Sequence, residues 1–188
     1  MQVQCGPLKV GDKGAQQRYL TEPILSVERL QVEREGVLGL VGDETVLDAH
    51  HQRHPLRKNQ DGAHGVSLGF TSHYAAMQAQ FGNHMTLGCA GENLIVEAGR
   101  RIQPEEVAAG LLVLDPRGRL KGRLANVVVA PPCKPFTAFA LGYRTVAAEV
   151  LKASLQFLDG GTRGFYCTWS GENGPAIVTL GDQVALAD

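Results

Sequence analysis

The sequence of 188 residues has no long apolar run and no excess of charge of either sign. Its 18 basic and 19 acidic side chains nearly cancel, so it has neither the electrostatic footprint of a nucleic-acid-binding protein nor a polybasic membrane patch. No segment reaches the roughly eighteen apolar residues of a membrane span, and the first residues lack the apolar core of a signal peptide. These absences predict a cytoplasmic protein that binds neither nucleic acid nor membranes.

Several familiar motifs are also missing. The four cysteines, at positions 5, 89, 133 and 167, include no Cys-x-x-Cys pair, which argues against a zinc knuckle or a thioredoxin-like motif. Neither G-x-x-x-x-G-K-[ST] nor G-x-G-x-x-G occurs, so nucleotide binding of those types is not expected. We expect Cys5, Cys89 and Cys167 to be small buried hydrophobic residues.

What is present indicates one mostly β domain over residues 1–188. Apolar residues make up 44% of the chain, and no Ser/Gly/Pro-rich linker divides it, so a single sizeable core is expected. Alternating or short apolar segments predict strands at 25–32 with a bulge at 28–29, and at 66–70, 94–96, 111–114, 127–129, 165–169, 177–179 and 184–186. Residues 171–174 predict a hairpin between the last strands. The spacing is typical of a barrel or sandwich.

Two helices are predicted among these strands. The first begins at a capping Thr71 or Ser72, ends at Gly82 and buries one face. That face consists of Tyr74, Met77 and Phe81. The second helix spans about 146–158 and ends at the glycine pair that follows. Its buried stripe consists of Ala147, Leu151, Leu155 and Leu158.

Cys133 is the strongest candidate for chemistry. It follows an apolar segment, 126–130, within the sequence Pro-Pro-Cys-Lys-Pro. Because prolines remove backbone donors, a strand cannot simply continue past them, and the thiol should lie exposed at a strand end. The adjacent Lys134 would favour the thiolate, which is the form that attacks electrophiles and binds soft metals.

All six histidines lie between positions 50 and 84. On a helix, His50 and His54 would lie on one face and could chelate a metal, although Pro55 would end that helix. The alternative is a solvated loop that presents cationic groups to an anion. His64 lies between glycines just before a strand, where a histidine is either structural or catalytic.

Glu92 and Asn93 precede the strand at 94–96. In one interpretation they belong to a turn in which Asn93 bonds to nearby backbone and Glu92 is solvated. In the other, both point into a cleft where Glu92 transfers protons and Asn93 orients a polar ligand. The residues themselves leave both interpretations open.

Taken in order, these features resemble the MOSC domain, found at the C-terminal end of molybdenum-cofactor sulfurases and as small stand-alone bacterial proteins. The resemblance covers about residues 25–186. It rests on Gly-Leu-Val-Gly-Asp at 39–43, Asp-Gly-Ala-His-Gly at 61–65, Gly-Glu-Asn-Leu at 91–94, Pro-Cys at 132–133, Arg-Gly-Phe-Tyr at 163–166 and Leu-Gly-Asp-Gln-Val at 180–184. The Gly-Glu-Asn-Leu and Pro-Cys motifs are the most specific pair.

The resemblance implies a MOSC-like β-barrel of mixed strands with a few peripheral helices. It also implies that Cys133 ligates molybdenum in a bound molybdopterin cofactor for the reduction of N-hydroxylated compounds, or carries persulfide sulfur between a donor and an acceptor protein. Glu92 and His64 would be catalytic. Asn93 would help to bind the cofactor. Because an anionic phosphate needs cationic or backbone donors, the candidates to bind it are Lys134, Arg163, Arg53, Arg57 or Lys58.

The sequence departs from the family pattern three positions before Cys133. Members often carry an arginine there, and this chain has Ala130. One cation that would hold a phosphate or favour the thiolate is therefore missing. This departure supports an alternative function, a non-enzymatic binding or scaffold module that keeps the fold with a degraded site.

Overall fold

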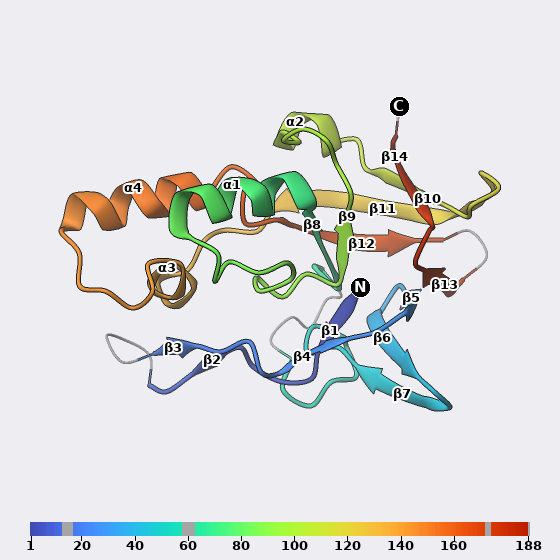
Figure 1. The fold of residues 1–188 in the computed structure, drawn as a ribbon. Coiled ribbons are helices and arrows are strands. Elements are labelled where there is room, and N and C mark those ends of the chain that lie inside the picture. The colour runs from blue at the N-terminus through green and yellow to red at the C-terminus, as the bar shows by residue number, and fades with distance from the viewer. Residues whose placement is uncertain (13–16, 58–62, 172–173, 188) are drawn as a thin grey trace.

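A computed structural model describes residues 1–12, 17–57, 63–171 and 174–187 and shows the predicted mostly β fold (Figure 1). Its largest sheet is six-stranded, mixed and nearly closed, with the order β14-β10-β11-β12-β8-β9. The β8–β9 pair is parallel and the other pairs are antiparallel. The strands are β8 (Val66–Phe70), β9 (Leu94–Val96), β10 (Leu111–Leu114), β11 (Leu120–Val129), β12 (Phe165–Ser170) and β14 (Gln183–Leu186).

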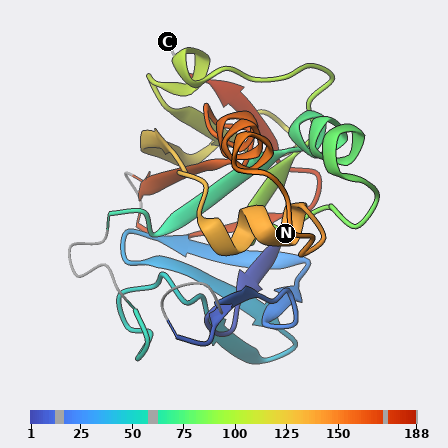
Figure 2. The ribbon, with the colours of Figure 1, turned by 90° about the vertical axis from the view of Figure 1, so that its left-hand side faces the viewer.

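A four-stranded antiparallel sheet, with the order β13-β5-β6-β7, lies below the larger sheet in Figures 1 and 2. Its strands are β5 (Arg29–Glu33), β6 (Gly36–Val41), β7 (Glu44–Leu47) and β13 (Ala176–Thr179). The first part of the chain adds two short antiparallel pairs, β1–β4 and β2–β3. Their strands are β1 (Gln2–Gln4), β2 (Lys9–Val10), β3 (Arg18–Tyr19) and β4 (Ile24–Ser26).

The helices are α1 (Thr71–Phe81), α2 (Pro104–Val107), α3 (Lys134–Ala140) and α4 (Ala148–Leu158). Figure 1 shows α1 and α4 at the same end of the molecule, with α3 below α4 and the β2–β3 hairpin beneath it. Among the described residues, no helix is both long and apolar enough to cross a membrane.

Two apolar clusters hold these parts together. The first joins the two larger sheets, because Leu30 and Val37 of the four-stranded sheet pack in one cluster with Leu68 and Phe165 of the six-stranded sheet. The second lies under the helices, where Tyr74, Met77, Phe136 and Leu158 meet Leu8 and Tyr19 of the N-terminal segment. Each fully buried large apolar side chain contributes roughly 1.5–3 kcal/mol. The second cluster therefore anchors the β2–β3 hairpin against the helical end.

The structure confirms the predicted strands from residue 66 onward, although the one predicted at 127–129 is the end of the longer β11, and it corrects two connections. Residues 25–32 do not form one bulged strand, because β4 pairs with β1 whereas β5 pairs with β6 and β13. Strands β12 and β13 belong to different sheets, so the connection through 171–174 is not a hairpin between paired strands. Residues 172 and 173 of that connection lie outside the described residues.

The two predicted helices form, with corrections at their starts. The N-cap of α1 is Phe70, because the Thr71 hydroxyl instead bonds to the backbone of Ala98. Helix α4 begins at Ala148, and Ala147, predicted to be buried, is its exposed N-cap. The sequence analysis missed α3, in which Pro135 lies in the first turn, where a proline needs no hydrogen-bond donor.

Candidate functional site

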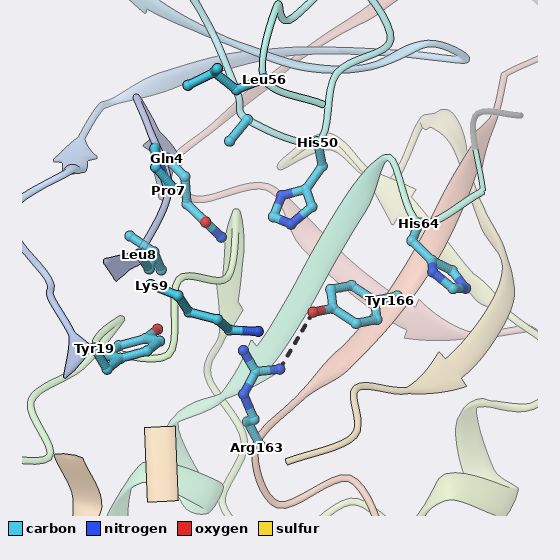
Figure 3. A pocket seen from close by; sticks show the side chains of 11 residues that line it. Gln4, Pro7, Leu8, Lys9, Tyr19, His50, Leu56, His64, Arg163 and Tyr166 are labelled. Carbon is cyan, nitrogen blue, oxygen red and sulfur yellow. Dashed lines mark hydrogen bonds between the residues drawn. The ribbon is translucent and has the colours of Figure 1, made fainter. Parts of the chain in front are cut away.

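A cavity of about 300 Å³ opens between the N-terminal segment, the loop after β7 and the start of β12. Its size falls in the range of small-molecule sites. The lining combines cationic, hydrogen-bonding and apolar side chains, which point toward a common space in Figure 3. The lining residues are Gln4, Pro7, Leu8, Lys9, Tyr19, Ala49, His50, Leu56, His64, Arg163 and Tyr166.

Arg163 is the buried cation of this cavity. It lies in the turn between α4 and β12 and is only 8% exposed. Its guanidinium stacks on the Phe136 ring at 5.2 Å and makes long hydrogen bonds to Ala90 O at 3.4 Å and Tyr166 Oη at 3.5 Å. Its buried Nε has no partner among the described residues. A buried guanidinium with an unused donor is suited to binding an anion.

The protein itself keeps Arg163 charged. Burial works to lower the pKa of Arg163, but Tyr166, Tyr19 and Cys133 outweigh burial and raise that pKa. The cavity therefore has a permanent positive charge at its base.

Cys133 lies between β11 and α3, outside the cavity lining but within electrostatic range of this cation. Strand β11 ends at Val129, as predicted, and Cys133 is the N-cap of α3. The thiol is half-buried and packs against the cluster that contains Tyr19. It interacts electrostatically with both Arg163 and Tyr19. Cys133 thus interacts with two residues that line the cavity, Tyr19 and Arg163.

His64 and Tyr166 form the opposite side of the cavity. Their rings stack with centroids 5.1 Å apart and an interplanar angle of 20°. The backbone of His64 has a φ of 65°. In the turn expected there from the sequence, the histidine itself therefore adopts the left-handed backbone conformation. His64 lines the cavity together with Tyr166, whose hydroxyl contacts Arg163.

Glu92 lies behind Arg163, in the protein interior. It is 4% exposed, and its Oε2 accepts a hydrogen bond of 2.6 Å from the Tyr74 hydroxyl. Its Oε1 is buried without a partner among the described residues. A space of about 10 Å³, close to the size of one water molecule, is lined by Glu92, Ala130 and Arg163 together. Gly69 makes room for the carboxyl, because a Cβ there would lie 2.7 Å from Oε1.

Burial raises the pKa of Glu92, and the Tyr74 hydrogen bond and the Arg163 charge only partly offset burial. The folded state therefore retains a proton that the unfolded state releases above about pH 4.3. The free energy of unfolding should therefore fall as the pH rises above about 4.3, by up to about 1.4 kcal/mol per pH unit, until Glu92 also loses its proton in the folded state. We expect Glu92→Gln to gain stability relative to wild type between pH 4 and 7, as measured by urea denaturation. If the stabilities of wild type and Glu92→Gln changed in parallel with pH, this expectation would be contradicted. Glu97→Gln is the control, because Glu97 is exposed and its replacement should leave the pH profile unchanged.

Asn93 does not have the predicted role in ligand binding. Its Oδ1 accepts from Ser67 N and Ser67 Oγ, both at 2.9 Å. Its Nδ2 donates to Asp48 Oδ2 at 2.8 Å and Gln2 O at 3.3 Å. With its side-chain hydrogen bonds used and only 1% of its surface exposed, Asn93 ties β1 and β8 to the loop after β7.

The predicted phosphate-binding cations separate into three groups. Arg163 lines the cavity, whereas Arg53 is exposed and pairs with Glu33 at 3.2 Å. Arg57 and Lys134 are also exposed and do not line the cavity. Lys58 lies outside the described residues. The predictions for Arg53, Arg57 and Lys134 are therefore not supported, because their choice rested on charge and proximity in sequence.

The histidine-rich segment is a loop rather than a helix, and two of its histidines are buried instead of solvated. His51 is fully buried and its Nε2 bonds to Glu33 Oε1 at 2.9 Å, while His54 is 8% exposed. Among the described residues, no group of three or more acidic, histidine or cysteine side chains could hold a metal ion. Cys89 and Cys167 are buried as predicted; Cys5 is exposed, so that prediction was wrong.

Sequence reasoning missed several residues of the cavity. Lys9 and Tyr19 come from the short strands β2 and β3, and Tyr166 alternates outward from the core face of β12. The adjacency of Tyr166 to Arg163 in the Arg-Gly-Phe-Tyr motif was a usable signal for it. No sequence signal pointed to Lys9 or Tyr19, because their strands have only two residues each and such short strands show no alternating pattern.

Comparisons with known proteins define the fold and leave the family open. No family model and no curated protein matches the chain. Among solved structures, the chain is similar in fold to the YuaD protein from Bacillus subtilis. The TM-score is 0.53 and the identity is 15%, over 97% of this chain and 93% of that one. At this identity the similarity shows a shared fold.

Proposed function

We propose that this chain is a molybdenum-cofactor-associated protein of the MOSC type. Arg163 would bind the phosphate of a pterin cofactor in the cavity, and Cys133 would be the thiolate ligand of its metal. The observation that carries the proposal is the buried Arg163 guanidinium, whose Nε has no partner among the described residues and whose charge interacts with the half-exposed Cys133 thiol.

The residues present fit such a group. A phosphate needs cationic donors, which Arg163 and Lys9 supply, and a planar ring system needs apolar and aromatic surfaces, which Leu8 and Tyr19 supply. Cys133 offers the soft anionic sulfur that suits a thiophilic metal. When bound, the cofactor would supply the two-electron chemistry that reduces N-hydroxylated compounds.

The chain's own residues would orient the cofactor and manage protons. Arg163 is held over the Phe136 ring at 5.2 Å, so little side-chain freedom remains to be lost when an anion binds. Glu92, whose pKa is raised by burial, lies next to Arg163 across the water-sized space. It would hold one proton close to the site, with Tyr74 fixing its orientation at 2.6 Å.

Arg163 also bears on the alternative of a degraded scaffold module. Ala130, which replaces the family's arginine, lines the same small space as Arg163. A guanidinium is therefore present beside position 130, although it comes from another part of the chain. The site therefore keeps the positive charge of Arg163 despite the loss at Ala130, which favours a working site over a degraded one.

A persulfide carrier is the second candidate function. The half-exposed Cys133 next to the Arg163 charge is suited to holding an anionic persulfide. In this version the cavity would accept the sulfur donor's or acceptor's anionic group.

The test is the molybdenum and phosphorus content of the protein purified from a molybdenum-sufficient host. We expect about one equivalent of each, because one buried cation and one thiol define one site. Protein that contains neither, and takes up neither when mixed with isolated cofactor, would contradict the cofactor-binding version.

A further inference from the structure

A buried carboxylate fixes the orientation of the His50 ring at the cavity. Asp48 is fully buried, and its Oδ1 accepts hydrogen bonds of 2.9 Å from both the backbone N and the Nδ1 of His50. An ionised carboxylate only accepts, so Nδ1 carries a proton and Nε2 is the nitrogen left to face the cavity. His50 therefore presents either a lone pair or, after gaining a proton, a charged N–H donor.

Asp48 retains its negative charge inside the protein. Its Oδ2 accepts from Gln4 N and Asn93 Nδ2, both at 2.8 Å. Burial works to raise the pKa of Asp48, but the hydrogen bonds from His50 and Gln4 outweigh burial and lower it. A carboxylate that is already ionised and held in place can stabilise a positive charge on His50 without reorganising.

While the cavity holds no anion, its other cations disfavour a positive charge on His50. Figure 3 shows His50 and Arg163 directed into the cavity from opposite sides. The charged and titratable groups that line it with His50 are Lys9 of β2, Tyr19 of β3, His64 before β8, Arg163 before β12 and Tyr166 of β12. Lys9 and Arg163 repel a further positive charge, and a dianion bound between them reverses that effect.

We propose that the cavity binds a dianionic oxyanion group and takes up one proton on His50 as it does so. The proton comes from solvent and forms one N–H bond at Nε2, so the ligand is held between an imidazolium and a guanidinium. The inference rests on the anion-binding part of the proposed function. It adds that the site prefers dianions to monoanions and that binding weakens as the pH rises.

Isothermal titration calorimetry of the full chain with inorganic sulfate tests this inference, because sulfate does not itself titrate near neutral pH. Measured at pH 7.5 in buffers of different ionisation enthalpy, wild type should take up close to one proton per sulfate. His50→Gln should remove the uptake and weaken binding by about tenfold or more. His84→Gln is the matched control, since His84 is exposed and bonds to Phe139 O and Ala140 O outside the cavity.

The outcomes separate the inference from the proposed function. Sulfate binding that requires Arg163 but proceeds without proton uptake, or with uptake that persists in His50→Gln, would overturn the inference alone. Acetate is a monoanion, so acetate that binds as tightly as sulfate would also overturn the inference alone. No sulfate binding to wild type would overturn both. If His50→Gln fails to fold, Asp48→Asn makes the same test, because an amide cannot stabilise the imidazolium and the uptake should fall.

Discussion

Arg163→Gln is expected to abolish retention of the anionic cofactor and to weaken sulfate binding by at least about 30-fold, or roughly 2 kcal/mol. The side chain is 8% exposed, and it supplies the permanent charge at the base of the cavity. Glutamine retains hydrogen-bonding groups but no charge. Sulfate titration and the phosphorus content of the purified variant measure the effect.

Two further variants make the result specific. Arg163→Lys keeps the charge but loses the planar fork that stacks on Phe136, so its affinity should lie between wild type and Arg163→Gln. Arg53→Gln removes an exposed cation that pairs with Glu33 outside the cavity, and its affinity should match wild type. Equal losses in Arg163→Gln and Arg53→Gln would mean that net charge alone matters.

Cys133→Ser is expected to eliminate metal retention or persulfide formation while leaving the fold intact. Cys133 is a half-exposed N-cap of α3, and serine is among the preferred residues at N-caps. The thermal midpoint should therefore stay the same or rise slightly. Mass spectrometry after incubation with a cysteine desulfurase should show one added sulfur atom on wild type and none on the variant.

Cys5→Ser provides the control for this thiol. Cys5 is exposed and lies near Asp48, where burial and the carboxylate charge raise the pKa of its thiol. A raised pKa leaves less of the reactive thiolate. Sulfur found on Cys5 in the Cys133→Ser variant, or molybdenum retained by that variant, would contradict the role of Cys133.

The sequence was sufficient to predict elements with strong local patterns. Val66–Phe70 and Phe165–Ser170 alternate in a way that only a strand satisfies, and Thr71–Phe81 ends at a glycine with a φ of 110°. Strand β1 was missed because its buried residues include Gln2 and Gln4. Their side-chain amides donate to Gly88 O and Gly91 O, contacts that no local pattern reveals.

The candidate site was predicted in part for the same reason. Cys133 and His64 stand out locally, through flanking prolines and glycines. His64 lies on the cavity lining, whereas Cys133 lies outside it and within electrostatic range of Arg163. The Asp48–His50 pair could not be recognised, because Asp48 is held by Gln4 and Asn93, which lie 44 and 45 positions away.

Anomalous diffraction at the molybdenum edge, on crystals of the protein purified from a molybdenum-sufficient host, tests the central claim most directly. We expect a molybdenum peak beside Cys133 Sγ and phosphate density in contact with the Arg163 guanidinium. A molybdenum peak away from Cys133, or a cavity without phosphate density in protein that contains molybdenum, would contradict it.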